Sequence, residues 1–185
     1  MTEDLKPWFP IRTERLLLRD VGEEDFADVH AYAEQPQVAR LMDWGPNTPE
    51  QTRVRMDLWL EDQKRWPRDE VSLAIEHVAD RQVIGSVRLA VSDRANLTGD
   101  IGYSLHSAYW RQGYATEAAR AVVDAGFRAL GLRRIWAECD VRNVGSWGVM
   151  QKLGMRREAH HHSDKLVKGA WRDSYLYAIL ADEWI

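Results

Sequence analysis

The segment 101–117 combines the residue types that hold a phosphate group. An apolar strand is expected at 100–106, and a helix begins at Gly113 after a short loop. The first turn of a helix exposes backbone N–H groups without intrahelical partners, and the positive end of the helix dipole lies there. Gly113 and Ala115 leave this turn open to a ligand, and Arg111 adds a positive charge. The pattern predicts a pyrophosphate site, with an ordinary strand-to-helix turn as the alternative.

The segment lacks the common nucleotide-binding motifs, but its positive charge suits an anionic ligand. The chain has neither the G-x-x-x-x-G-K-S/T loop nor a G-x-G-x-x-G loop with an acidic residue about 20 positions later. Residues 110–157 hold nine Lys and Arg against four Asp and Glu, so this segment carries +5, the rest carries −9, and the whole chain carries −4. A basic segment in an acidic protein suits a small polyanion there and a cation elsewhere, although charges that are merely solvated give the same count.

Length and composition favour one globular domain in the cytoplasm. The 185 residues are 45% hydrophobic and 29% charged, which is typical of an ordinary folded domain. No run of about 18 apolar residues is present to cross a membrane, and the opening MTEDLKPWFP does not resemble a secretory signal. The acidic net charge disfavours nucleic acid as a partner, and a single cysteine excludes an internal disulfide.

The order of the expected elements indicates a single α/β domain over residues 1–185, with 1–10 as an N-terminal extension. Thr48-Pro49-Glu50-Gln51 is a strong helix start, with Thr as the cap, Pro in the first turn and Gln three residues after the cap. Hairpins followed by a strand–helix–strand crossover imply one mixed, mostly antiparallel sheet flanked by helices. Strands are expected at 15–21, 71–78, 83–91, 100–106, 134–141, 155–159 and 174–179, helices at 22–34, 49–66, 113–130 and 143–153, and a polar connection at 160–173.

Four stretches of the chain resemble one family in the right order. Residues 110–118, WRQGYATEA, closely resemble the phosphate-loop signature of the GNAT acyltransferase superfamily, and more narrowly that of its RimJ/RimL branch. Trp110 stands where the superfamily usually has Gln or Arg, and Trp is common there in this branch. The other similar stretches are the opening strand RLLLR at 15–19, the pair Asn143–Ser146 and Lys152–Met155, and the ending Trp171–Asp173, Tyr177, Leu180 and Glu183-Trp184.

The resemblance implies an N-acetyltransferase that uses acetyl-CoA. It implies direct transfer of the acetyl group to a primary amine, either a protein N-terminal α-amine or a small-molecule amine, with a non-catalytic acyl-CoA sensor as the alternative. The pantetheine arm is then expected between the strands at 100–106 and 134–141, and the pyrophosphate on the backbone amides of 111–116. The cofactor-binding residues implied are Leu105, His106, Trp110, Arg111, Gln112, Gly113, Tyr114, Ala115, Thr116, Asn143 and Ser146.

Three chemical tasks need residues in such a transfer. The Leu105 backbone N–H is expected to stabilise the oxyanion, and the Ser146 hydroxyl to protonate the leaving thiolate, unless Ser146 only supports its helix start. Asn143 is expected to bond the pantetheine amides or to cap a helix. The amine must lose a proton before it attacks, and Asp100 is the candidate base, with Glu138, His106 and ordered water as alternatives.

The cysteine, the histidine run and three of the tryptophans are not assigned a chemical role in the transfer. Cys139 lies in mid-strand without a nearby His and is read as an inert, buried thiol. The run at 160–162, three consecutive His residues, lacks the i, i+4 spacing of helical metal pairs, so a solvated loop and no metal site are expected. Trp44, Trp59 and Trp66 either shape the acceptor pocket or pack in the core. The oligomeric state stays open between monomer and homodimer.

Overall fold

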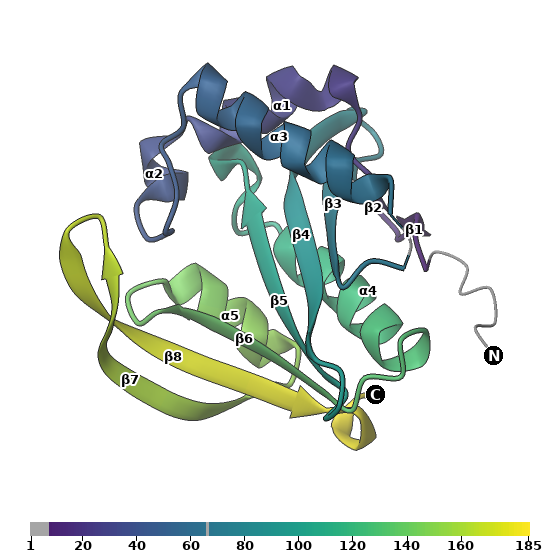
Figure 1. Cartoon of the computed structure of the whole chain (residues 1–185), viewed down its shortest axis with the longest axis vertical. Coiled ribbons are helices and arrows are strands. Elements are labelled where there is room, and N and C mark those ends of the chain that lie inside the picture. Colours follow the sequence, from purple (N-terminus) through teal and green to yellow (C-terminus); the bar gives the residue numbers. More distant parts are fainter. Residues whose placement is uncertain (1–7, 66) are drawn as a thin grey trace.

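The chain forms one eight-stranded sheet in the order β1-β2-β3-β4-β5-β6-β8-β7 (Figure 1). A computed structural model describes residues 8–65 and 67–185. Of the paired strands in that part of the chain, only β5 and β6 run parallel. The strands are β1 (Ile11–Arg12), β2 (Leu16–Arg19), β3 (Glu70–His77), β4 (Gln82–Asp93), β5 (Thr98–Leu105), β6 (Arg134–Asp140), β7 (Arg156–Val167) and β8 (Ala170–Leu180). The α-helices are α1 (Phe26–Ala33), α2 (Pro36–Ala39), α3 (Pro49–Gln63), α4 (Tyr114–Arg128) and α5 (Val144–Lys152), with 3-10 turns at Glu23–Asp25, Ser107–Tyr109 and Ala181–Glu183. This confirms the mixed, mostly antiparallel α/β fold.

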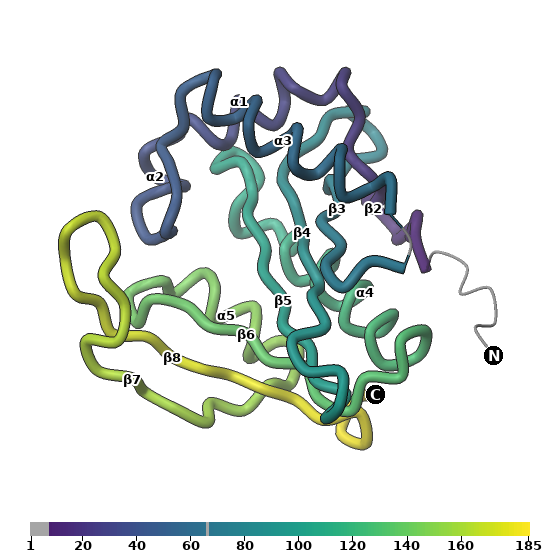
Figure 2. Tube along the Cα trace, viewed as in Figure 1, coloured from purple at the N-terminus to yellow at the C-terminus, as the bar shows by residue number. Residues whose placement is uncertain are grey.

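Helices cover both faces of the sheet and enclose two apolar cores. The larger core lies between the sheet and α4 and α5, and the smaller one lies between the sheet, α1 and α3 (Figure 2). Ile75 belongs to the larger core and its neighbour Ala74 to the smaller one, because successive side chains of a strand point to opposite faces. The same alternation separates Ile84 from Val83 on β4.

Helix boundaries follow some sequence signals and depart from others. The Thr48 hydroxyl accepts a hydrogen bond from Gln51 N–H, and the Gln51 side chain accepts one from Thr48 N–H, so the expected capping box begins α3. That helix ends at Gln63 rather than 66, and Trp66 lies outside the described residues. The helix expected at 22–34 ends at Ala33, before Pro36, and Pro36 then begins the short helix α2, since proline is well tolerated in a first helical turn.

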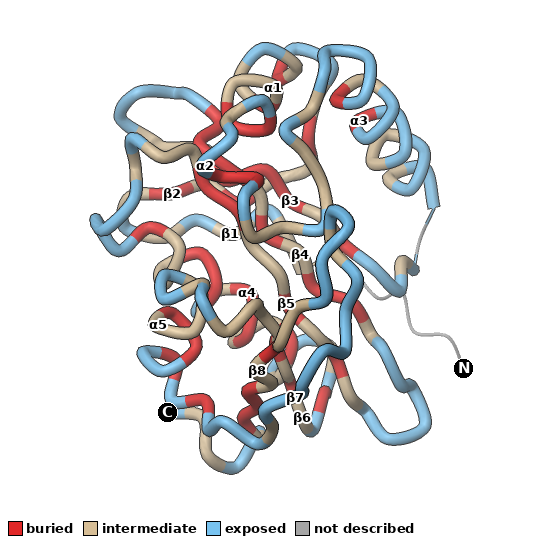
Figure 3. Tube along the Cα trace, turned by 90° about the vertical axis from the view of Figure 1, so that its left-hand side faces the viewer, coloured by how far each residue is buried: buried red, intermediate tan, exposed pale blue. Residues whose placement is uncertain are grey.

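The expected polar loop at 160–173 is wrong, because β7 and β8 run through it as a long hairpin. Lys168 and Gly169 form its two-residue turn with positive φ angles of 51° and 76°, the backbone that a tight hairpin turn requires. Nearly every residue of β7 is exposed (Figure 3), so no apolar face marks it as a strand. The tip of the hairpin reaches α2, where Lys168 Nζ donates to the Ala39 carbonyl at 2.5 Å.

The sheet opens between β5 and β6. The two strands pair only from Thr98 to Asp100, yet β5 stays paired with β4 as far as Leu105, and β6 stays paired with β8 as far as Asp140. The two strands therefore diverge (Figure 1). Backbone groups on the facing edges beyond Asp100 do not pair with each other, so other donors and acceptors must satisfy them. This gap lies where the resemblance places the pantetheine arm.

Candidate functional site

The loop that joins β5 to α4 has an unusual backbone held by its own side chains. Arg111 has a φ of 61° and Gly113 a φ of 87°, and both residues are exposed. A non-glycine residue at positive φ is strained and tends to mark a functional turn. The Trp110 indole donates to the Leu105 carbonyl at 2.9 Å, and the Gln112 side chain donates to the Ala108 carbonyl at 2.9 Å. These bonds tie the loop back onto the end of β5.

The first turn of α4 presents free backbone donors. Gly113 contributes no side-chain cap, and the earliest intrahelical bond runs from Glu117 N–H to the Gly113 carbonyl at 3.0 Å. The N–H groups of 114–116 therefore have no acceptor within the helix. The Tyr114 side chain is buried in the core and bonds His77, so only its backbone is available to a ligand. A helix start with free N–H groups of this kind is suited to binding an anion.

An open hollow of about 390 Å³ lies beside this turn. Arg120 and Lys152 give it positive charge. Glu117 also faces it, but Thr13 Oγ1 at 2.6 Å and Arg15 Nε at 2.7 Å donate to its carboxylate. Burial alone would raise the pKa of Glu117, whereas these hydrogen bonds lower it, so the carboxylate stays charged and paired. The hollow is lined by Glu14, Gly113, Thr116, Glu117, Arg120 and Lys152.

The β5 edge of the gap carries backbone donors aimed away from β4. His106 N–H donates to the Ile84 carbonyl on β4 at 2.8 Å. Because successive residues of a strand direct their N–H and C=O groups to opposite edges, Leu105 and Tyr103 direct theirs toward the gap. The Leu105 carbonyl accepts from Trp110, and the Leu105 N–H points into the gap beside it. That is the geometry an oxyanion or amide ligand requires.

The start of α5 forms the opposite wall. Asn143 caps this helix, with Oδ1 accepting from Ser146 N–H at 3.2 Å, and its amide nitrogen donates to nothing within the described residues. Both readings of Asn143, cap and ligand donor, are therefore compatible with its position. Ser146 is half-buried, and its hydroxyl lies 3.4 Å from that of Tyr103.

Tyr103 bridges the gap and is the residue that sequence reasoning missed. Its hydroxyl donates to the Ser146 carbonyl at 2.9 Å, so it joins β5 to α5. Burial raises the pKa of Tyr103 well above its usual value, so the hydroxyl keeps its proton. The alternation of Ile101, Tyr103 and Leu105 indicated only a core-facing strand position.

Cys139 lies on the face of β6 that α4 and α5 cover, close to Ser146. Burial raises the pKa of this thiol to about 11, and contact with the Ser146 hydroxyl offsets the effect only in part. A thiol with such a pKa is protonated at neutral pH and is a poor nucleophile. The structure thus agrees with an inert Cys139.

Two of the candidate bases are poorly placed. Asp100 lies five residues before Leu105 on β5, or about 16 Å along the strand, in the part where β5 and β6 still pair. Its carboxylate binds Arg88 at 2.6 Å, and an amine reacting beside Leu105 N–H is out of its direct reach. His106 has both ring nitrogens engaged, Nδ1 with Ala108 N–H and Nε2 with the Gln35 side chain.

Glu138 is better placed for proton transfer. It lies on β6 in the unpaired part of the gap, on the face opposite Cys139. Ser174 Oγ lies 2.5 Å from Glu138 Oε1 and 2.7 Å from Asp164 Oδ2, and Lys165 Nζ lies 2.9 Å from Glu138 Oε2. A hydroxyl has one hydrogen, so Ser174 donates to one of the two carboxylates at a time, and Lys165 gives Glu138 a positively charged partner. This arrangement holds the Glu138 carboxylate in place beside the gap.

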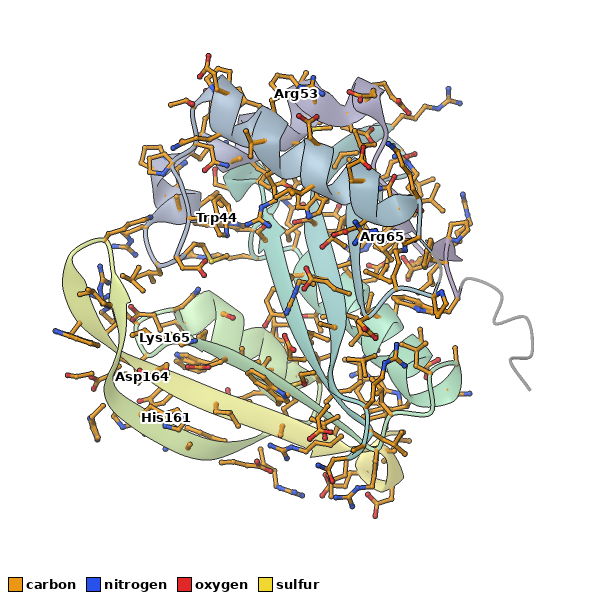
Figure 4. The ribbon with its side chains drawn as sticks, in the orientation of Figure 1. Trp44, Arg53, Arg65, His161, Asp164 and Lys165 are labelled. Atoms are coloured by element: carbon orange, nitrogen blue, oxygen red, sulfur yellow. The ribbon has the colours of Figure 1, made fainter. Side chains whose placement is uncertain are left out.

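The structure brings most of the implied residues together around the gap. Residues 105, 106 and 110–116 lie at the β5–α4 end, and Asn143 and Ser146 lie across it, whereas Asp100 is remote. Trp44 and Trp59 are partly buried against the smaller core, which favours packing for both. Figure 4 shows Trp44 on the segment between α2 and α3, and Asp164 and Lys165 on β7. Among the described residues, no helix is both long and apolar enough to cross a membrane.

Comparisons with known proteins lead to one family. Residues 15–156 match the model of the Acetyltransferase (GNAT) domain. The chain is similar to the N-acetyltransferase YnaD of Bacillus subtilis, at 33% identity over 178 residues that cover 94% of this chain and 98% of that protein. A crystal structure of a GNAT-family acetyltransferase from Bacillus anthracis matches with a TM-score of 0.83 and 31% identity, over 94% of this chain and 99% of that one.

A ribosomal-protein-S5-alanine acetyltransferase from Vibrio fischeri also matches, with a TM-score of 0.77 and 25% identity over 95% of this chain and 98% of that one. The domain match covers the β5–α4 loop, the gap and the start of α5. The chain therefore belongs to the GNAT family and is an N-acetyltransferase.

Proposed function

We propose that this enzyme transfers the acetyl group of acetyl-CoA directly to a primary amine. The observation that carries the proposal is the first turn of α4, with free N–H groups at 114–116, at the end of the gap between β5 and β6. When the diphosphate of CoA binds on that turn, its pantetheine arm extends into the gap between the two strands. Arg111, Arg120 and Lys152 supply positive charge for the phosphates.

The gap provides the donors that an amide-containing arm and a thioester need. In our proposal Asn143 donates its free amide nitrogen to the arm, and the Leu105 N–H donates to the thioester carbonyl. The developing oxyanion strengthens that bond in the transition state, because a donor already in position costs no reorganisation. Tyr103 keeps β5 and α5 at a fixed separation through its bond to the Ser146 carbonyl.

Proton transfer is assigned to Glu138 and Ser146. Glu138 accepts a proton from the substrate ammonium, directly or through one water, and the amine nitrogen then attacks the thioester carbon. A C–N bond forms and the C–S bond breaks, and the sulfur of the leaving thiolate takes the proton of the Ser146 hydroxyl. The surplus proton of the attacking nitrogen passes to the Ser146 oxygen, and Glu138 releases its proton to solvent, so the products are the amide and the free thiol. Glu138 replaces Asp100 in this assignment because of its position on the unpaired part of β6.

The acceptor class is a cationic primary amine, either a protein N-terminal α-amine or a small molecule. Three carboxylates, Glu138, Asp140 and Asp164, lie on the β6–β8–β7 side of the gap. Lys165 pairs with Glu138, and Arg142 and Arg172 pair with Asp140, so among the described residues Asp164 is the one of the three without an ion pair, and its charge favours a cationic acceptor. The relationship to an enzyme named for the alanine of ribosomal protein S5 supports the N-terminal α-amine as the first candidate to test.

Release of free thiol from acetyl-CoA against a panel of polyamines, amino acids and short N-terminal peptides tests the proposal. Turnover that depends on one class of amine is the expected result. Tight CoA binding without turnover on any amine would overturn it in favour of an acyl-CoA sensor. The same panel is run with Glu138→Gln, and CoA affinity is measured in parallel. For an amine that the wild type acetylates, loss of turnover with unchanged CoA affinity in Glu138→Gln identifies loss of the base.

A further inference from the structure

Two histidines and an aspartate on the β7–β8 hairpin converge on one point, outside the acetyl-transfer site. His160 Nε2 and His162 Nδ1 each lie 3.1 Å from Asp173 Oδ2. The three ligand atoms all lie within 4.8 Å of one another. Residues i and i+2 share a face in a strand, so the spacing that argued against a helical metal pair suits this strand.

An irregularity in the hairpin builds this convergence. His161 pairs with Ser174 and Lys165 pairs with Arg172, so the three residues 162–164 on β7 face the single residue Asp173 on β8. The bulge turns His162 back toward Asp173, and Ser163 within it has a φ of 49°. The His160 and His162 rings consequently lie only 4.0 Å apart between centroids.

Two of the three distances between ligand atoms are close to those around a tetrahedral zinc ion. With bonds of about 2.0–2.1 Å from zinc to imidazole nitrogen and carboxylate oxygen, neighbouring ligand atoms stand about 3.3 Å apart. The two His–Asp distances of 3.1 Å already lie near that value. The separation between the two histidine nitrogens is at most 4.8 Å, so the exposed His162 ring has to move toward His160 for both nitrogens to bind one ion.

The aspartate is oriented by a second hydrogen bond. Ser163 N–H donates to Asp173 Oδ1 at 2.9 Å, which leaves Oδ2 directed at the two rings. Carboxylate ligands that are held in this way from behind bind metal ions more tightly than free ones. The donor set of two imidazoles and one carboxylate suits a borderline divalent ion rather than Mg²⁺ or Ca²⁺, which prefer oxygen ligands.

We propose that His160, His162 and Asp173 bind a divalent transition-metal ion of the Zn²⁺ type, with a fourth position open to water. The ion ties β7 to β8 across the bulge. Asp173 is followed by Ser174, whose hydroxyl contacts Glu138, so the ion also fixes the hairpin next to the carboxylates of the acceptor side. The competing explanation is that Asp173 serves only as a hydrogen-bond acceptor for the two rings.

Zinc titration of the full chain, without an affinity tag and after removal of metals with a chelator, distinguishes the two explanations. In competition with a chromophoric chelator, the wild-type chain should take up one equivalent of Zn²⁺. His162→Ala and Asp173→Asn should each weaken binding by at least about tenfold, as loss of a ligand does. His161→Ala is the matched control, because His161 lies between the two ligands in sequence and, by strand alternation, on the other face of β7, where it pairs with Ser174.

Two results would overturn the proposal. One is wild-type affinity no higher than that of the double variant H162A/D173N, and the other is an equal loss in His161→Ala. Each variant is first compared with wild type by thermal unfolding in chelator, so that a folding defect is not read as lost binding. Co²⁺ in place of Zn²⁺ gives a second readout, since a tetrahedral site shows visible absorption that Asp173→Asn should abolish.

Discussion

Gly113 offers the sharpest single perturbation of the phosphate site. With φ at 87°, any side chain here must adopt a left-handed conformation, which costs about 1–2 kcal/mol. A Cβ at this position would also lie 3.3 Å from Arg15 Nη2, so the Arg15 side chain must move slightly. The same side chain donates to the Gln112 carbonyl, so its movement disturbs the loop before α4. Gly113→Ala should therefore redirect the donors of the α4 turn. Loss of one hydrogen bond to a charged phosphate is worth about 1.5–3 kcal/mol, or roughly ten- to a hundredfold in CoA affinity.

Gly131 provides the matched control after the end of the same helix. Its φ is 63°, and a Cβ there meets nothing within 4 Å, so Gly131→Ala carries the backbone cost alone. Urea unfolding should show similar destabilisation in both variants, whereas calorimetric titration with CoA should show weaker binding only for Gly113→Ala. If both variants bind CoA equally well, the phosphates do not rest on this turn.

Three further predictions follow from contacts at the site and in the core. Ser146→Ala should lower kcat about a hundredfold in the thiol-release assay, as loss of a general acid does, and leave CoA affinity nearly unchanged. Glu138→Gln should lower kcat by a similar factor, whereas Asp100→Asn should lower it far less; the opposite ranking would restore Asp100 as the base. Burial alone would raise the pKa of Asp25, but hydrogen bonds from Arg19 and the Gly22 N–H lower it. The contribution of Asp25 to the free energy of unfolding is therefore fully present above the pKa of an aspartate in the unfolded chain, about 3.9. It is lost as the pH falls through the lower pKa that Asp25 has in the folded protein. Asp25→Asn should cost about 3 kcal/mol in urea unfolding at pH 7, and the difference from wild type should vanish in strong acid; a constant difference would contradict the assignment.

Local signals in the sequence predicted the elements that carry the site. The capping residues Thr48 and Asn143 and the glycine at 113 each start a helix where expected, because cap and turn preferences act within a few residues. The turn with free backbone donors at 114–116 was predictable for the same reason. Its donors belong to the backbone of one short segment.

Features that depend on distant pairing were not predictable in this way. The β7–β8 hairpin lacks an apolar stripe, so its residues 160–167 carry no strand period, and its register is set by β6 and by the Lys168-Gly169 turn. Tyr103 looks like any core position until the sheet opens beside it and α5 supplies Ser146. The distance from Asp100 to Leu105, which disfavours Asp100 as the base, could be judged only once the place of strand divergence was known.

Binding of pantetheine, which lacks the diphosphate and adenosine of CoA, tests the central claim most directly. If the diphosphate rests on the N–H groups of 114–116, calorimetry should show pantetheine binding at least about a hundredfold more weakly than CoA, given two or more charge-assisted bonds lost. Gly113→Ala should then weaken CoA and leave pantetheine unchanged. Pantetheine affinity equal to that of CoA, or an equal loss for both ligands in Gly113→Ala, would contradict the account.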